Sequence, residues 1–222
     1  MNKARISKVA ASIQPAQQRQ GRRPTARSER TRHEVLDAAA LCIAREGFAA
    51  ATTTRIAERA GVSWGVLQYH FGDKDGLMLA VLEYGMDQTE SLFTEVITVG
   101  IDANSLEERL RILTNEAWQI YSSPLARAAT EIVINYRGKW QQDPDKNRYL
   151  LELNRTQTRL ARRALYCAIG DKKVAHFLAG IFLAALHGFE ASLLQYGPGH
   201  AFQKERDALV QVMVTYAQGA VL

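Results

Sequence analysis

The sequence predicts an all-α protein in which a small three-helix domain near the N-terminus precedes a larger helical bundle. Apolar residues recur at helical spacing from Ser28 onward, and no period-2 alternation typical of a strand follows residue 77. The breaks in the pattern are glycines, prolines and capping residues, which are the punctuation of helices. Since 47% of the 222 residues are apolar and 23% are charged, the chain can bury the core of one large or two small globular domains.

Each early helix has its own start and stop signals. The first is expected from Ser28 to a stop at Gly47. The second follows the hydroxyl caps of residues 52–54 and ends at Gly61, and the third begins after Ser63 and runs to about His70. Asp73 then caps a fourth helix.

Later helices are separated by five further breaks, which bring the expected total to about nine. The breaks lie at 100–104, Pro124, 142–145, 170–171 and 197–199. Residues 105–108 (SLEE) form a capping box for the helix after the first of them. We therefore expect three segments: a flexible basic arm over 1–27, a helix-turn-helix domain over 28–76, and a helical bundle over 77–222.

Positive charge is concentrated at the N-terminus. Residues 1–33 contain nine Lys and Arg against Glu29 alone, a net charge of +8, so within a total of +5 the other 189 residues carry −3. A basic head on a nearly neutral body favours a polyanionic partner. The scattered apolar residues of the head do not form a secretory signal, and Cys42 and Cys167 lie far apart, so we expect a cytoplasmic protein without disulfides.

The segment from Thr54 to Phe71 has the layout of a helix-turn-helix. Ala57 is small enough for two helices to cross closely, and Gly61 permits a positive φ in the turn. At 100° per residue, Leu67 and Phe71 of the third helix face a core together with Ser63.

The opposite face of that third helix is almost uncharged, which suits a DNA groove better than a merely solvated surface. Gly65, Gln68 and Tyr69 point outward, and Trp64 borders them. Gln68 is suited to hydrogen bonds with a base edge, and Gly65 permits a close approach to the duplex. Tyr69, His70 and Lys74 are placed for phosphate oxygens, as are the N-termini of the second and third helices.

Residues 52–77 (TTTRIAERAGVSWGVLQYHFGDKDGL) resemble the DNA-binding signature of the TetR/AcrR family of transcriptional regulators. The resemblance covers about residues 28–82. It implies a three-helix DNA-binding domain, a divergent helical ligand-binding domain, a homodimer and repression relieved by a small molecule. It assigns phosphate contacts to Thr52 or Thr53, Tyr69 and Lys74, and recognition-helix positions to Ser63, Trp64, Gly65, Gln68 and His70. Two departures are Gln68 in place of an aromatic residue and Trp64 in place of a polar or basic one.

The basic arm has a possible role of its own. Gly21-Arg22-Arg23-Pro24 is similar to minor-groove hooks, although the order of its residues differs from the usual Arg-Gly-Arg-Pro. Insertion of Arg22 and Arg23 into a narrow minor groove is one interpretation, and a generic phosphate-binding tail is the other.

The stretch from Val174 to Tyr196 is the most apolar in the chain. A membrane span is the alternative, but His187, Glu190 and Gln195 interrupt the stretch, which favours a helix of a bundle. Small residues on one stripe permit close approach of another helix. We expect two copies of the chain to pair through this helix and the last one, by contacts of Gly180, Ala184, Gly188, Ser192, Leu209, Met213 and Tyr216.

Residues of the bundle that combine aromatic and polar character are candidates for a ligand pocket, with a plain hydrophobic core as the alternative. They are Trp118, Tyr121, Glu131, Asn135, Tyr166, His187 and Glu190. The spacing of Glu131 and Asn135 is the better indication of polar recognition. His187 and Glu190 alone do not make a catalytic or metal site, so we expect neither an enzyme nor a cofactor.

The predicted function is thus a homodimeric repressor that binds a palindromic operator in double-stranded DNA and is released by a small-molecule effector, with no membrane partner. The alternative is a sequence-tolerant architectural DNA-binding protein with a structural dimer domain. An enzyme that uses His187 and Glu190 is a third hypothesis.

Overall fold

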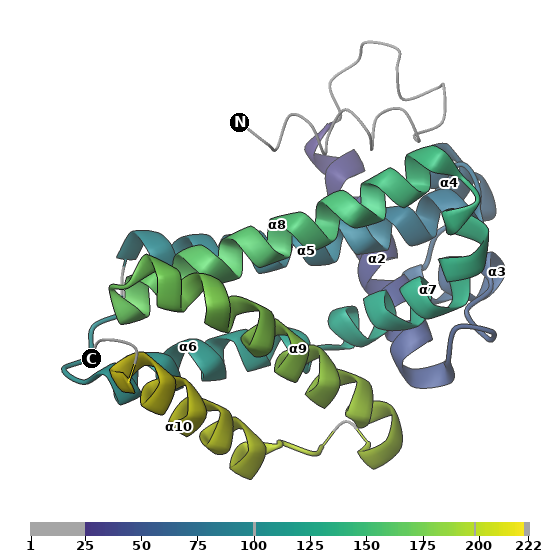
Figure 1. Cartoon of the computed structure of the whole chain (residues 1–222). Helices are drawn as coiled ribbons and strands as arrows, with labels where there is room; N and C mark the ends of the chain where they lie inside the picture. Colours follow the sequence, from purple (N-terminus) through teal and green to yellow (C-terminus); the bar gives the residue numbers. More distant parts are fainter. Residues whose placement is uncertain (1–24, 100, 198, 220–222) are drawn as a thin grey trace. The chain divides into compact units, whose positions relative to one another are not determined.

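We describe a computed structural model of the chain, which covers residues 25–99, 101–197 and 199–219. These residues form nine helices and no strand (Figure 1). The expected breaks recur as helix ends. Thr25 caps α2 (Ala26–Glu46), Thr52 caps α3 (Thr53–Ala60) and Ser63 caps α4 (Trp64–Phe71).

Contacts divide the chain into two units, and this division differs from the predicted one. Unit 1 comprises residues up to Met86 together with 124–153, and unit 2 comprises 87–123 and 154–222. Unit 1 thus contains α2, α3, α4, the first part of α5 (Lys74–Val99), α7 (Pro124–Gln141) and the first turns of α8 (Pro144–Ile169). The predicted boundary at 76/77 therefore falls inside unit 1, and the predicted arm overlaps the start of α2 by two residues.

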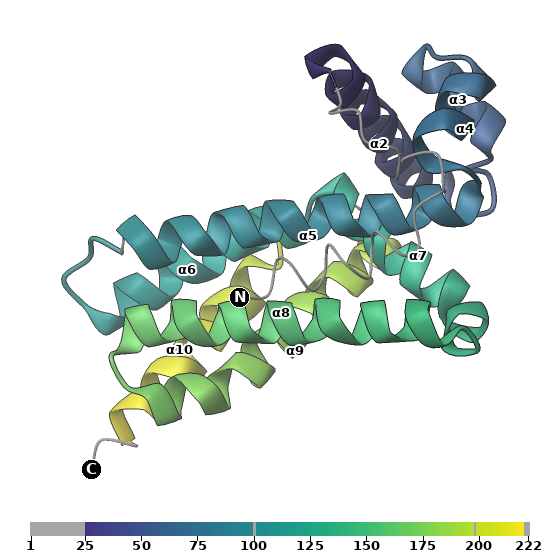
Figure 2. The same cartoon turned by 90° about the horizontal axis from the view of Figure 1, so that it is seen from above.

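One hydrophobic core unites the early helices of unit 1 with α7. Figure 2 shows α2, α3 and α4 side by side, and α7 packs closely along α2. The fully buried side chains include Leu36, Ile56 and Leu67 from the early helices. α7 adds Ile132 and Trp140 to the same cluster. Burial of this apolar surface stabilises the unit.

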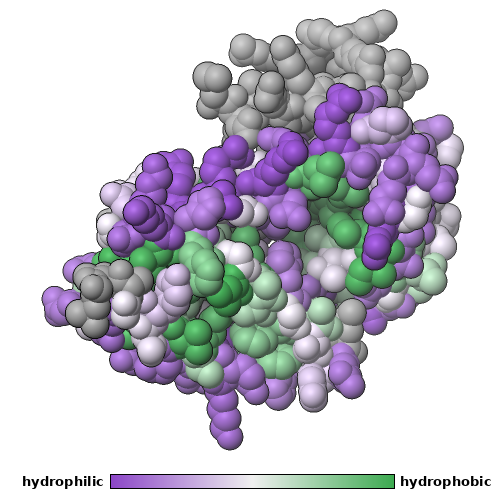
Figure 3. Space-filling model, viewed as in Figure 1, coloured by the Kyte–Doolittle hydropathy of each residue, from purple (hydrophilic) through white to green (hydrophobic). Residues whose placement is uncertain are grey.

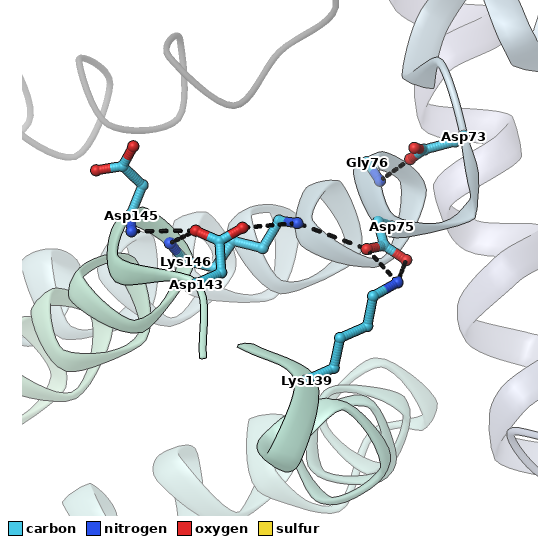
Figure 4. Close-up of polar contacts among 7 residues, drawn as sticks. All are labelled: Asp73, Asp75, Gly76, Lys139, Asp143, Asp145 and Lys146. Carbon is cyan, nitrogen blue, oxygen red and sulfur yellow. Dashed lines mark hydrogen bonds and ion pairs between the residues drawn. The ribbon is translucent and has the colours of Figure 1, made fainter. Parts of the chain in front are cut away.

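Polar contacts join α7 and the first turn of α8 to the start of α5 (Figure 4). The carboxylate of Asp75 lies 2.7 Å from Lys139 Nζ and 3.6 Å from Lys146 Nζ. Burial alone would raise the pKa of Asp75, but the hydrogen bonds from Lys139 and Tyr136 and the two lysine charges lower it overall. Burial and the Asp75 charge raise the pKa of the Tyr136 hydroxyl. A second link runs from Glu131 Oε2, which accepts the backbone N–H of Phe48 at 2.8 Å.

Unit 2 is a bundle of α6 (Leu106–Tyr121), α9 (Lys172–Tyr196), α10 (Gln203–Gly219) and the remaining parts of α5 and α8. Ser105 caps α6 as the capping box predicts, and the Asp171 carboxylate accepts the first N–H groups of α9. α6, α9 and α10 contact one another. Their core includes Leu113, Phe182 and Met213, all fully buried.

Only one helix among the described residues is long and apolar enough to span a membrane, over Lys172–Leu193. It belongs to α9, whose Leu178, Phe182 and Leu186 are buried in unit 2. One such helix is weak evidence, because a core helix of a bundle meets the same criteria of length and composition.

Candidate nucleic-acid interface and candidate ligand cluster

The second helix of the predicted motif is held at both ends by local contacts. The Thr52 hydroxyl accepts the N–H of Arg55 at 3.2 Å, which satisfies one of the free donors at the start of α3. Gly61 ends α3 with φ 65°, the left-handed conformation that a residue with a side chain adopts only at a cost. The N–H of Val62 donates to the carbonyl of Ala57, and this turn leads directly into α4.

α4 divides its side chains between the core and solvent in the way a groove-reading helix requires. The Ser63 hydroxyl accepts the N–H of Val66 at the start of the helix. Leu67 and Phe71 are buried, and both pack in the core of unit 1. On the opposite side Trp64 is 55% exposed and Tyr69 is 61% exposed. Gly65 and Gln68 are also exposed, so four uncharged residues form one outward surface.

His70, which we expected to contact a phosphate, is not part of that outward surface. It is only 8% exposed, because it lies three residues after Leu67 and therefore on the same inner face of α4. Burial is the largest cause of its lowered pKa, and the positive charge of Arg32 lowers that pKa further. His70 is thus part of the packing beneath the helix, and a direct phosphate contact by its ring is excluded in this conformation.

Cations and free backbone donors flank the outward surface. Lys74 is half-buried, with its Nζ 4.7 Å from the centre of the Phe48 ring. Thr52 is exposed and Thr53 is half-buried at the N-terminus of α3. Arg55 is a cation that the sequence prediction did not name. Its side chain is 57% exposed even though it pairs with Glu46 at 3.1 Å.

The predicted arm residues Arg22 and Arg23 lie outside the described residues. The candidate interface is therefore built here from α3, α4 and the first turn of α5 alone. It combines one uncharged helix face with basic side chains and helix N-termini at its border, which is a common arrangement for a DNA-binding surface.

Residues 35–81 match the bacterial regulatory proteins of the tetR family. In this stretch, which spans α3 and α4, the chain is similar to the TetR family. Over 49 residues it is 43% identical to the HTH-type transcriptional repressor AcnR of Corynebacterium glutamicum. That match covers 22% of this chain and 26% of AcnR, so the chain covers about a quarter of the length of the curated relatives it matches.

The fold of the whole chain resembles solved structures of TetR-type regulators at low sequence identity. A putative TetR-family regulator from Mesorhizobium loti has a TM-score of 0.64 at 17% identity, with 88% of this chain and 98% of that chain covered. A putative regulator from Saccharomonospora viridis in complex with choline has a TM-score of 0.59 at 18% identity, with 86% and 96% covered. At this identity the likeness is one of fold.

Of the seven predicted pocket residues, five belong to unit 2, and four of these lie near one another on α6 and α9. Tyr121 lies edge-on to His187, with ring centres 5.0 Å apart. Burial and the charge of Glu190 both raise the pKa of the Tyr121 hydroxyl. Trp118 lies one turn before Tyr121 on α6, and its ring packs edge-on against that of Phe189, with ring centres 6.3 Å apart. Tyr121 and Glu190 are almost fully buried, whereas His187 keeps more than a third of its surface.

The other three predicted pocket residues do not join that cluster. Glu131 belongs to unit 1, where its carboxylate accepts the Phe48 N–H, and Asn135 is exposed and donates to a carbonyl of its own helix. Tyr166 is 50% exposed on α8. The sequence spacing of Glu131 and Asn135 placed them on one helix face, but it contained no information on which helix would cover that face.

The predicted pairing surface is partly exposed and partly internal. On α9, Gly180, Ala184 and Gly188 are exposed and Ser192 is half-exposed, with Phe177 and Ile181 beside them. Figure 3 shows apolar side chains gathered over α9 and α10 on the visible face. On α10, Tyr216 is exposed and stacks on Phe177 at 4.7 Å.

Leu209 and Met213 are not available for a contact between subunits. They are 8% and 0% exposed because they face α6 and α9 within unit 2. The exposed apolar side chains of α10 are instead Ala208, Val212 and Tyr216.

Within the described part of the chain, no group of three or more His, Cys, Asp or Glu side chains is placed to hold a metal ion. Cys42 and Cys167 are both free thiols, the first buried and the second exposed.

Proposed function

We propose that this protein is a DNA-binding transcriptional regulator whose α4 reads a major groove. The observation that carries the proposal is the outward surface of α4, where Gln68 and Gly65 lie exposed between the aromatic rings of Trp64 and Tyr69. A glutamine side chain forms two hydrogen bonds with the edge of an adenine, and a glycine leaves room for the duplex. Exposure of aromatic rings to water on a helix face without charged residues is unfavourable, and a partner that covers the rings removes this exposure.

Phosphates on either side of the groove would be bound by the groups that border α4. The N-terminus of α3 offers free N–H groups beside the Thr52 and Thr53 hydroxyls, and the N-terminus of α4 does so beside Ser63. Lys74 at the start of α5 and Arg55 on α3 add positive charge. Such contacts fix the position of the protein on DNA without selecting a sequence.

We expect a homodimer, and support for it comes from the apolar face that α9 and α10 leave exposed in unit 2. Gly180, Ala184 and Gly188 let a second helix approach closely, and Phe177 and Tyr216 supply apolar area around them. Two copies related by a two-fold axis would present two α4 helices. The operator would then be an inverted repeat with half-sites separated by about 34 Å or a multiple of it.

Regulation would come from a small molecule bound in unit 2. Support comes from the cluster around Tyr121 and Glu190, and from the fold shared with a regulator that was solved in complex with choline. An effector releases DNA only to the extent that it binds the released state more tightly than the bound state. In the cytoplasm, the protein without effector would occlude a promoter and repress it.

The test of this function is selection of a duplex from a random pool by the full-length protein, followed by footprinting. Protection confined to an inverted repeat is expected. Gln68→Ala should weaken binding to the selected repeat by about 1–3 kcal/mol and leave binding to random DNA unchanged, because only a base contact distinguishes the two.

Two controls accompany this experiment. Lys74→Ala should weaken binding to both kinds of DNA and lower the salt slope by about 1 per site, as loss of a phosphate contact does. Gln142→Ala removes an exposed glutamine from the α7–α8 turn and should change neither affinity. Equal loss on both DNAs for Gln68→Ala would refute the base contact, and uniform coating of DNA would indicate an architectural protein.

A further inference from the structure

We propose that the cluster around Tyr121 and Glu190 in unit 2 binds an organic cation, and that this cation is the effector of the regulator. Binding of the cation depends on the chemistry of the cluster alone. The role of the cation as effector rests on the proposed function, because an effector has meaning only for a protein that binds DNA.

The site is centred on a hydroxyl that the fold buries without satisfying it. Tyr121 is 4% exposed, and its hydroxyl has no hydrogen-bond partner among the described residues. A buried hydroxyl without a partner costs free energy, and native structures rarely retain one without a reason. Tyr121 ends α6, and its ring packs edge-on against His187 of α9, so the hydroxyl lies between two helices of unit 2.

A carboxyl group lies near this hydroxyl. Glu190 is 1% exposed on α9, one turn after His187, and its negative charge affects the pKa of the Tyr121 hydroxyl. Burial is the largest cause of the raised pKa of Tyr121, and the charge of Glu190 raises that pKa further. The potential that disfavours a phenolate at this place also disfavours an anionic ligand, and it favours a positive charge.

Aromatic surface completes a site of this kind. A cation without strong hydration is attracted to the faces of aromatic rings, and the attraction grows when water is excluded. Tyr121 supplies one ring and His187 a second. Burial lowers the pKa of His187 and so favours its neutral ring, which does not repel a cation.

The guanidinium of Arg206 is held away from Tyr121 by contacts of its own. It lies over the Trp118 ring at 5.6 Å, and its N–H groups donate to Asn115 Oδ1 and to the carbonyl of Ala201. Asn115 and Trp118 both precede Tyr121 on α6, so the positive charge of Arg206 is fixed at the earlier turns. The ring face of Trp118 is therefore occupied, and Tyr121 and His187 are the rings left for a ligand.

Access to the site is through His187. It is the exposed member of the cluster, and it lies on α9 directly beside Gly188, where an added Cβ would meet no described atom within 4 Å. The geometry thus fits a compact cation with an apolar body, such as a substituted ammonium ion.

The experiment compares three benzyl compounds of different charge on the full-length protein, by calorimetry and thermal shift. They are benzyltrimethylammonium, its uncharged carbon isostere neopentylbenzene, and the anion phenylacetate. We expect the cation to bind at least about tenfold more tightly than the other two, since only it gains from the charge of Glu190 and from the aromatic rings.

Variants identify the site. Glu190→Gln should weaken binding of the cation about tenfold or more, Glu190→Asp should restore most of the affinity because it keeps the charge, and Glu116→Gln should have no effect. Glu116 is the matched control, since it is an exposed glutamate on α6. Near-ultraviolet circular dichroism establishes that each variant is folded. The comparison of probes on the unaltered protein decides the proposal even when Glu190→Gln does not fold.

Equal or tighter binding of the neutral or anionic probe would overturn the proposal, and so would absence of any binding or a cation affinity that survives Glu190→Gln in a folded protein. DNA binding is measured separately on the selected repeat. Cation binding by a protein that selects no DNA would refute the proposed function and leave the binding site standing. Sequence-specific DNA binding released by anions and not by the cation would refute the inference alone.

Discussion

A histidine inside unit 1 makes the stability of that unit depend on pH. His70 lies beneath α4 beside the positive charge of Arg32, and both burial and this charge lower its pKa. The folded protein therefore favours the neutral ring more strongly than the unfolded chain does. Below the ordinary histidine pKa of about 6.5, the unfolded chain takes up the proton first, and this uptake favours unfolding.

The expected result is that the free energy of unfolding is at its full value above about pH 6.5 and falls as the pH drops through the lowered pKa of His70. Urea denaturation at pH 7.5 and pH 5.5 measures the difference. The loss should be smaller in His70→Asn, which has no proton to gain, and unchanged in His176→Asn, which removes an exposed histidine of α9. The same loss in His70→Asn as in the unaltered protein would contradict this account.

The sequence was sufficient for the residues whose position follows from helical periodicity. Gly65, Gln68 and Tyr69 face outward as the 100° rotation per residue predicts. His70 could have been placed by the same arithmetic, because it lies one turn after Leu67, but its polar ring was assigned to DNA. Periodicity thus outweighs a residue's polar character when a side chain is placed on the inner or outer face of a short helix.

The start of α5 depends on one glycine. Asp73 Oδ1 accepts the N–H of Gly76 at 2.8 Å, and the turn between α4 and α5 closes tightly around this contact (Figure 4). A side chain at position 76 would place its Cβ 2.1 Å from the backbone oxygen of Phe71. A backbone atom cannot move aside as a flexible side chain can, so the two helices would have to separate.

Gly76→Ala should therefore destabilise the protein by about 1–3 kcal/mol, as overpacking does. Gly138→Ala is the matched control. This glycine lies within α7, and no described atom stands within 4 Å of an added Cβ. Replacement by the better helix former should stabilise the protein by about 0.5–1 kcal/mol. Thermal denaturation compares the two variants, and an equal effect of both would show that the turn has room.

Helix boundaries were predictable to within a few residues because each has a local chemical cause. Gly47, Gly61 and Gly197 end helices with positive φ, and Ser105 and Asp171 begin them by accepting backbone N–H groups. The partners of each helix were not predictable in the same way. Leu209 and Met213 continue the apolar stripe of the last helix, and only the position of α6 determines that they are internal.

Pairing of two copies governs DNA affinity in the proposed function, because each copy contributes one half of the contact with an inverted repeat. Ala184 is exposed at the centre of the small-residue stripe of α9. A glutamate at this position would be buried opposite its own symmetry mate in a two-fold dimer, and burial of unpaired like charges is costly.

Ala184→Glu is expected to be monomeric in analytical ultracentrifugation at concentrations where the unaltered protein is dimeric, and to lose most of its affinity for the inverted repeat. Gln119→Glu adds the same charge at an exposed position of α6 and should remain dimeric. A monomeric unaltered protein, or a dimer that survives Ala184→Glu, would place the contact elsewhere.

The division into two units was beyond prediction from sequence order. Periodicity identifies α7 as an amphipathic helix, but nothing in its sequence states that Ile132, Tyr136 and Trp140 complete the core of α2 and α3 instead of that of the bundle. The assignment of contiguous domains at 76/77 assumed that neighbours in sequence are neighbours in space. Long-range packing of α7 on α2 overrides that assumption here.

The chain leaves unit 1 after Met86 and returns to it at Pro124. A fragment that stops after residue 86 would thus expose the apolar face of α2 from which the aromatic side chains of α7 had been removed. Fusion of such a fragment to another protein would transfer α4 without the side chains of α7 that complete the core beneath it. A transferable version of unit 1 has to contain both of its segments, up to residue 86 and 124–153, joined by a short linker in place of residues 87–123.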